Sequence, residues 1–131
     1  MARLPDWEER LGAYLRAPGR DVFAWGTNDC ALFSAGAVEA MRGEHPAPEF
    51  IGAYGDQAGA AEALRTLGAG TLFRTFDSHF PRKEPAFAHR GDLVMAQDAI
   101  GICMGSNGIF LKAEGGFAFL PRSEFQYAWE V

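Results

Sequence analysis

The sequence predicts one α+β domain over residues 1–131, in which N-terminal helices precede a small antiparallel sheet. Before residue 81, apolar residues recur at the three- and four-residue spacing of amphipathic helices. From Asp92 onward, short apolar runs alternate with the turn sequences Ser106-Asn107-Gly108 and Glu114-Gly115-Gly116, which are typical of β-hairpins. Helices followed by strands, without alternation between the two, favour the α+β class.

The helical part is predicted to contain four helices. They are expected to begin after Asp6, at Cys30, near Gln57 and near Leu72. In the first helix, Asp6 and Glu9 have the spacing of a capping box, and Pro18-Gly19 ends the helix. The second helix is expected to stop at Gly43, because glycine is favoured just past a helix C-terminus.

The second part is predicted to form an antiparallel meander of short strands. They are expected at residues 93–96, 100–104, 109–111 and 117–120. Pro121 then closes the sheet. The aromatic residues Phe125, Tyr127 and Trp129 are expected to cover its end.

Composition narrows the functional classes. A net charge of −5 argues against non-specific binding to nucleic acid. No apolar run is long enough for a membrane span, and the N-terminus lacks the pattern of a signal peptide. With Cys30 and Cys103 as its 2 cysteines, the chain suits neither a disulfide scaffold nor a cysteine-based zinc site, and we expect no cofactor.

Cys30 is the strongest candidate for chemistry. The competent N-cap residues Thr27, Asn28 and Asp29 come directly before it, so the thiol is expected in the first turn of a helix. The partial positive charge of a helix N-terminus favours a thiolate, which makes Cys30 a candidate nucleophile. The alternative is a buried, inert cysteine that serves as a small apolar residue.

The order of these motifs resembles the NlpC-type cell-wall cysteine peptidases, which are small papain-like enzymes. Members of that family carry Asp-Cys at a helix start, then Gly-Asp-Leu, then His-Val-Gly-Ile on the next strand. The matching residues here are Asp29-Cys30, Gly91-Asp92-Leu93 and Ala99-Ile100-Gly101-Ile102. The resemblance implies a papain-like fold and, in an active member, cleavage of peptidoglycan stem peptides.

A second resemblance covers nearly the whole chain. It rests on Arg3-Leu4-Pro5-Asp6-Trp7-Glu8, Trp25-Gly26-x-x-Asp29-Cys30, Arg90-Gly91-Asp92 and Ala128-Trp129-x-Val131. These segments resemble a poorly characterised family found in tailed phages, prophages and gene-transfer agents, usually among tail-tip genes. The resemblance implies synthesis in the bacterial cytoplasm, assembly into a virion or phage-like tail, and tail or baseplate hub proteins as partners.

The chain departs from the peptidase pattern at the general base. Where that family has its histidine, this sequence has Ala99, which cannot accept a proton. Asn28 occupies a second position at which relatives have histidine. The third, orienting group is expected near Leu111 or Lys112, and neither matches the histidine or amide of the family.

Three histidines could replace the missing base. His45 is expected at the far end of the Cys30 helix, and His79 in a segment before a proline-rich loop. His89 comes just before Gly91-Asp92 and is the best of the three candidates. All three also fit the simpler interpretation of exposed loop histidines.

Three further residues have alternative roles. Asp29 is expected to cap the helix rather than to act in catalysis. Trp25 either packs beside the helix start or binds substrate. Cys103 is expected on the same strand face as Ala99, toward Cys30, so that a redox pair of the two thiols is a hypothesis.

Two functions follow. In the first, the chain is a structural tail-tip component with an inactivated peptidase fold. In the second, it is a cysteine endopeptidase that cuts peptidoglycan during infection, with Cys30 as nucleophile and a histidine from elsewhere as base. The absence of a histidine before Ile100 favours the first.

Overall fold

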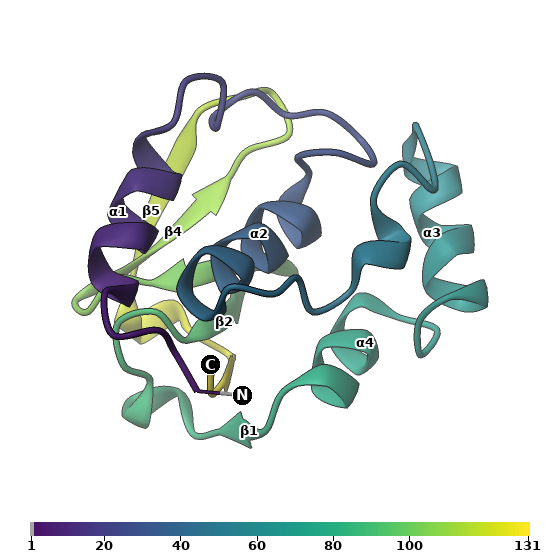
Figure 1. The fold of residues 1–131 in the computed structure, drawn as a ribbon. Coiled ribbons are helices and arrows are strands. Elements are labelled where there is room, and N and C mark those ends of the chain that lie inside the picture. The colour runs from purple at the N-terminus through teal and green to yellow at the C-terminus, as the bar shows by residue number, and fades with distance from the viewer. Residues whose placement is uncertain (1) are drawn as a thin grey trace.

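The computed structural model describes residues 2–131. Its helices are α1 (Trp7–Arg16), α2 (Cys30–Arg42), α3 (Gln57–Thr66) and α4 (Leu72–His79), with short 3-10 turns at Pro48–Phe50, Pro85–Phe87 and Arg122–Glu124. Its strands are β1 (Arg82–Lys83), β2 (Leu93–Ala96), β3 (Ala99–Cys103), β4 (Asn107–Leu111), β5 (Phe117–Pro121) and β6 (Tyr127–Trp129). The α+β class and the order of helices before the meander are therefore confirmed (Figure 1).

The helix ends match the prediction with one exception. The Asp29 carboxylate caps α2 by accepting from the Leu32 N–H, and Gly43 ends that helix with a left-handed φ of 87°. At α1 the predicted capping box is wrong, because the Asp6 side chain caps no backbone N–H. Its carboxylate instead accepts a hydrogen bond from Arg10 Nε at 2.9 Å.

The sheet is larger than the predicted meander. All strand pairs are antiparallel, in the order β1-β6-β2-β3-β4-β5. The sequence analysis missed β1 and β6, which have 2 and 3 residues. Residues 127–129 pair with β2 as well as β1, so the expected cover of the sheet is in fact part of it.

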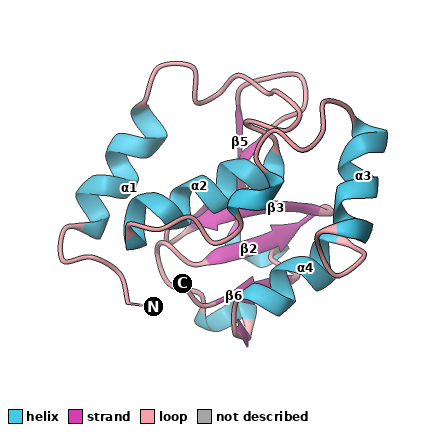
Figure 2. Ribbon diagram, turned by 45° about the vertical axis from the view of Figure 1, so that its right-hand side comes forward, coloured by secondary structure: helices cyan, strands magenta, loops and turns pink. Residues whose placement is uncertain are grey.

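Helix α2 lies across one face of the sheet and defines the main core (Figure 2). Phe33, Val38 and Met41 of this helix pack in one cluster with Ile100 and Ile102 of β3. The opposite face of the sheet carries a second buried cluster, which comprises Ala88, Val94, Ala96, Cys103, Phe110, Phe125 and Ala128. Within residues 2–131, no helix combines the length and apolarity required to cross a bilayer.

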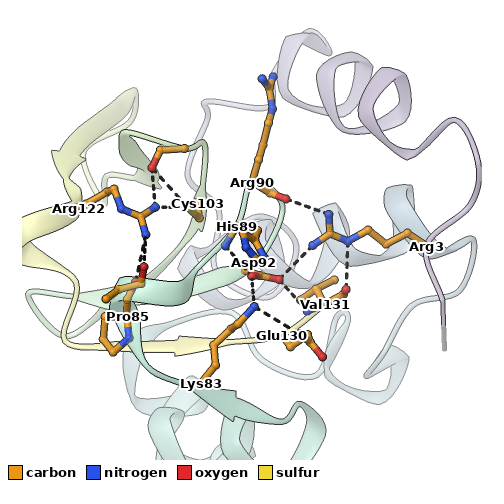
Figure 3. A network of polar contacts seen from close by, with 12 residues as sticks. Arg3, Lys83, Pro85, His89, Arg90, Asp92, Cys103, Arg122, Glu130 and Val131 are labelled. Carbon is orange, nitrogen blue, oxygen red and sulfur yellow. Dashed lines mark hydrogen bonds and ion pairs between the residues drawn. The ribbon is translucent and has the colours of Figure 1, made fainter.

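The two ends of the chain meet beside the start of β2 (Figure 1). The Asp92 side chain is 1% exposed, and each of its carboxylate oxygens accepts two hydrogen bonds. Oδ1 accepts from Arg3 Nη2 and from the backbone N–H of Val131, both at 3.0 Å. Oδ2 accepts from Lys83 Nζ at 2.9 Å and from the backbone N–H of His89 at 2.8 Å (Figure 3).

Arg3 completes this terminal clamp. Its guanidinium also donates to the backbone carbonyls of Val131 and Arg90, at 3.0 and 2.9 Å, and stacks 4.2 Å from the Trp7 ring centroid. Three of the segments that carry the whole-chain resemblance, which are the opening, Arg90-Gly91-Asp92 and the C-terminus, therefore converge on one buried carboxylate. In this structure, these segments hold the two ends of the chain against the start of β2.

Candidate functional site

The turn before Cys30 requires glycine at position 26. Gly26 has a φ of 82°, and a Cβ there would collide with the backbone carbonyl of Tyr54. The Gly26 carbonyl accepts from the backbone N–H of Gly52 at 2.7 Å, which fixes the 50s loop against this turn. The glycine of the Trp-Gly-x-x-Asp-Cys motif thus has a structural role.

Asp29 organises the same turn through its buried carboxylate, which is 2% exposed. Oδ1 accepts from the Leu32 N–H at 3.0 Å, and Oδ2 accepts from the Gly26 N–H at 3.0 Å and from the Tyr54 hydroxyl at 2.6 Å. Within residues 2–131, no lysine or arginine pairs with it. The prediction that Asp29 caps the helix is confirmed, and its charge is left without a cationic partner.

The surroundings of the Cys30 thiol oppose its ionisation. Burial raises the pKa of Cys30 above its ordinary value, and the negative charge of Asp29 raises it further. The backbone N–H groups of Ile100, Ala31 and Cys30 itself act in the opposite direction, but they do not reverse the shift. These effects oppose the thiolate that a helix N-terminus favours, and the nucleophilic role of Cys30 stays a prediction.

Of the two residues at the start of β3, Asp98 lines the cavity of Cys30, and Ala99 does not. Ala99 packs against the cluster on the opposite face of the sheet, whereas Asp98 lines the cavity that holds the thiol. The β2–β3 turn consists of Gln97 and Asp98, both with positive φ, so the strand begins at Ala99. The prediction that position 99 faces the nucleophile is wrong for its side chain.

None of the described histidines is hydrogen bonded to the thiol. His89 lies at the Asp92 end of the sheet, whereas Cys30 meets the opposite end of β2 and β3, so its proposed role as base is not supported by its position. His45 follows the C-terminal end of α2, where its Nδ1 accepts from the Ala47 N–H at 3.0 Å. Only His79 lines the same cavity as Cys30.

His79 is held at the end of α4 in a defined orientation. Its Nδ1 lies 2.8 Å from the carbonyl oxygen of Thr75. Because a carbonyl only accepts, Nδ1 carries the proton and the neutral ring keeps a lone pair on Nε2. Position and tautomer make His79 the one histidine with access to the cavity of Cys30.

The cavity itself has a volume of about 340 Å³ and lies between α2, α3 and α4. Alanine, leucine and phenylalanine make up more than half of its lining residues, and most of these belong to the three helices. Trp25, Tyr54, Cys30, Asp29, Asp98 and His79 also line it. Trp25 borders the cavity and packs edge-on against Phe23, with ring centroids 4.9 Å apart, so its packing role is confirmed and its role in substrate binding stays a prediction.

Cys103 lies on the other side of the sheet. Its side chain is fully buried in the cluster opposite α2, and Arg122 Nη1 lies 3.6 Å from its sulfur (Figure 3). Cys30 lies on the α2 side, so the hypothesis of a Cys30–Cys103 redox pair is contradicted. The reason is that the larger Ile100 and Ile102 occupy the α2 face of β3, which places Cys103 on the opposite face.

The remaining predicted positions have structural roles. Leu111 is buried in the main core, and Lys112 is exposed. Asn28 Nδ2 donates to the carbonyls of Arg20 and Val22, at 2.6 and 2.9 Å, and so holds the preceding loop. None of the three supplies an orienting group for a Cys–His pair.

In this structure, no histidine of residues 2–131 is within hydrogen-bond reach of the Cys30 sulfur. Nucleophilic catalysis by cysteine requires a base in hydrogen-bond reach of the sulfur. In this site the pKa of the thiol is shifted by burial, by the Asp29 carboxylate and by backbone N–H groups, and not by a histidine. Among residues 2–131, no three His, Cys, Asp or Glu side chains gather in a way that could hold a metal ion.

Sequence reasoning missed Tyr54 and Asp98. Tyr54 lies 25 residues from Asp29 in a loop, and no local pattern links the two. Asp98 could have been found, because a two-residue turn with an aspartate in left-handed conformation is a recognisable hairpin signal.

The comparison with protein families gives one match. The family described as Domain of unknown function (DUF6950) covers residues 2–131, and the chain belongs to it. No curated protein matches the chain.

Proposed function

We propose that this DUF6950 member is a papain-like, NlpC-type domain without peptidase activity, and that it serves as a structural component of a phage-like tail tip or baseplate. The fold part of the proposal is supported by the position of Cys30 at the start of α2, which packs on an antiparallel sheet. The tail-tip part rests on the sequence resemblance described above. The expected partners are tail or baseplate hub proteins.

One observation carries the loss of activity. Burial and the Asp29 carboxylate raise the pKa of Cys30, and no histidine of residues 2–131 is bonded to its sulfur. A peptidase needs the opposite environment, in which a cationic partner favours the thiolate. The site therefore has a cysteine at the position of a nucleophile, but no cationic partner that favours its thiolate.

The proposal is tested by two assays on the same proteins. Purified wild-type chain and Cys30→Ser are incubated with peptidoglycan sacculi, and released muropeptides are measured; we expect no release from either. Tagged versions of both are expressed in the host, and intact tails are purified and analysed by mass spectrometry. We expect equal incorporation of the two proteins. Muropeptide release by wild type alone would contradict the loss of peptidase activity, and absence of both proteins from tails would contradict the structural role.

A second candidate function is a working cysteine endopeptidase, and the position of His79 favours it. His79 lines the cavity of Cys30 and has an unprotonated Nε2 in its neutral form. The two side chains form no hydrogen bond in this structure, so this function requires them to come into contact during the reaction. His79→Ala would then abolish muropeptide release, and His89→Ala, at the other end of the sheet, would not.

A further inference from the structure

The cavity beside Cys30 has the size and wall of a small-molecule site. Its volume of about 340 Å³ lies in the range of ~300–1,000 Å³ that such pockets span. The wall is mainly apolar, with small side chains such as Ala35 of α2 and Ala60 of α3 on facing helices. Polar groups are few and lie among aromatic residues, which is the distribution that orients a bound ligand.

Apart from the titratable ring of His79, the charged side chains of the described cavity wall are two carboxylates. Asp29 and Asp98 line it, and among the described residues that form its wall there is no lysine or arginine. Asp29 uses three neutral donors, and the exposed Asp98 carboxylate forms no hydrogen bond or ion pair within residues 2–131. An anionic ligand would therefore meet repulsion at this wall, and a cationic one attraction.

Aromatic side chains strengthen the preference for a cation. Trp25, Phe50 and Tyr54 all line the same cavity. The faces of aromatic rings attract ammonium groups, and tryptophan does so most strongly. Carboxylates and aromatic rings around an apolar interior together match a molecule with an apolar body and an ammonium end.

We propose that this cavity binds a small apolar amine, with its hydrocarbon part between α2 and α3 and its ammonium group near Asp98. The inference does not rest on the proposed function, because it involves neither cleavage nor tail assembly. A chain that fails to enter tails, or one that cuts peptidoglycan, could still bind such a ligand.

The test uses three probes with the same eight-carbon chain and different head groups: octylamine, octanol and octanoate. Their dissociation constants for the full chain are measured by isothermal titration calorimetry at neutral pH. We expect octylamine to bind about two- to fivefold more tightly than octanol, and octanoate to bind most weakly. Equal affinities, or a preference for octanoate, would overturn the cationic part of the proposal.

Two variants locate the site. Asp98→Asn keeps a residue suited to the left-handed turn, and it should remove the advantage of octylamine over octanol. Ala60→Leu, in α3, should fill the cavity and weaken all three probes by about tenfold. Glu114→Gln and Ala13→Leu are matched controls away from the cavity and should change nothing. Unchanged affinity of the probes for Ala60→Leu, or no saturable binding to wild type, would overturn the proposal that this cavity is the binding site.

Discussion

Asp29 and Asp92 are both buried carboxylates, at 2% and 1% exposure, and both belong to the motifs that carry the family resemblance. Asp92 is paired with two cations, Arg3 and Lys83, and accepts two backbone N–H groups. Asp29 has only neutral donors, which are two N–H groups and the Tyr54 hydroxyl. The same residue type thus has its charge compensated at one site and uncompensated at the other.

The difference shows how charge is used in the two regions. At Asp92 the charge joins the N-terminal segment, β1 and the C-terminus, so its consequence is stability. Burial raises the pKa of Cys30, and the uncompensated charge of the neighbouring Asp29 raises it further. Cys30 therefore stands at a helix start, where a thiolate is favoured, and beside a carboxylate that opposes the thiolate.

Removal of the paired carboxylate should have the largest effect. Asp92→Ala leaves the Arg3 and Lys83 side chains, which are 17% and 15% exposed, without their common partner. Breaking a largely buried ion pair from one side costs about 3–5 kcal/mol, because it leaves unpaired charge behind. Urea denaturation measures the loss. Glu130→Ala is the matched control: Glu130 also pairs with Lys83 but is 64% exposed, so we expect a loss of about 0.5 kcal/mol or less.

A loss below about 1 kcal/mol for Asp92→Ala would show that the clamp is not a strong constraint. Asp92 would then contribute no more to the free energy of unfolding than Asp29, and the contrast between the two carboxylates would not extend to stability.

Neutralising Asp29 should reduce stability less than removing Asp92, and it should also change the reactivity of the Cys30 thiol. Asp29→Asn keeps an oxygen for the Leu32 N–H, but an NH2 group replaces Oδ2, which accepts from both the Gly26 N–H and the Tyr54 hydroxyl, at a cost of about 1–2 kcal/mol. The charge that raises the pKa of Cys30 is removed, so this pKa should fall and alkylation at fixed pH should accelerate. Tyr54→Phe removes one hydrogen bond and keeps the charge, and it should show no such acceleration. Equal rates in Asp29→Asn and wild type would contradict the assignment of the effect to Asp29.

The smallest effect is expected from the pH dependence of the clamp. Burial lowers the pKa of Lys83, but the hydrogen bonds and charges of Asp92 and Glu130 raise it by more, so the net shift is upward. A raised folded pKa means that Lys83 contributes stability below the unfolded value of about 10.4, and that this contribution is lost as the pH rises through the folded pKa. Urea midpoints of wild type should therefore fall more steeply above about pH 10 than those of Lys83→Arg, which stays charged. Parallel profiles would argue against a paired Lys83.

Local patterns predicted most of the helices and the meander. The start of α2 at Cys30 followed from consecutive N-cap residues, and its end from a glycine that adopts positive φ. The central strands followed from turn sequences between apolar runs. These signals lie within a few residues of the structure that they produce.

The failures concern long-range contacts. Strand β6 has 3 residues, and it is defined by pairing with β2 more than 30 residues earlier, which its own sequence does not reveal. The face of Ala99 depends on which face of β3 the isoleucines occupy, and a strand turned by one residue exchanges every side chain between faces. The hydrogen bond from Tyr54 to Asp29 also joins distant segments.

The state of the Cys30 thiol tests the central claim most directly. The rate of iodoacetamide alkylation is measured against pH in Cys103→Ser, so that Cys30 is the only thiol, with the double serine variant as blank. We predict slow reaction at neutral pH and a titration midpoint above the free value of about 8.5. Fast alkylation at neutral pH with a midpoint well below that value, abolished by His79→Ala, would show an activated Cys–His pair and contradict the account.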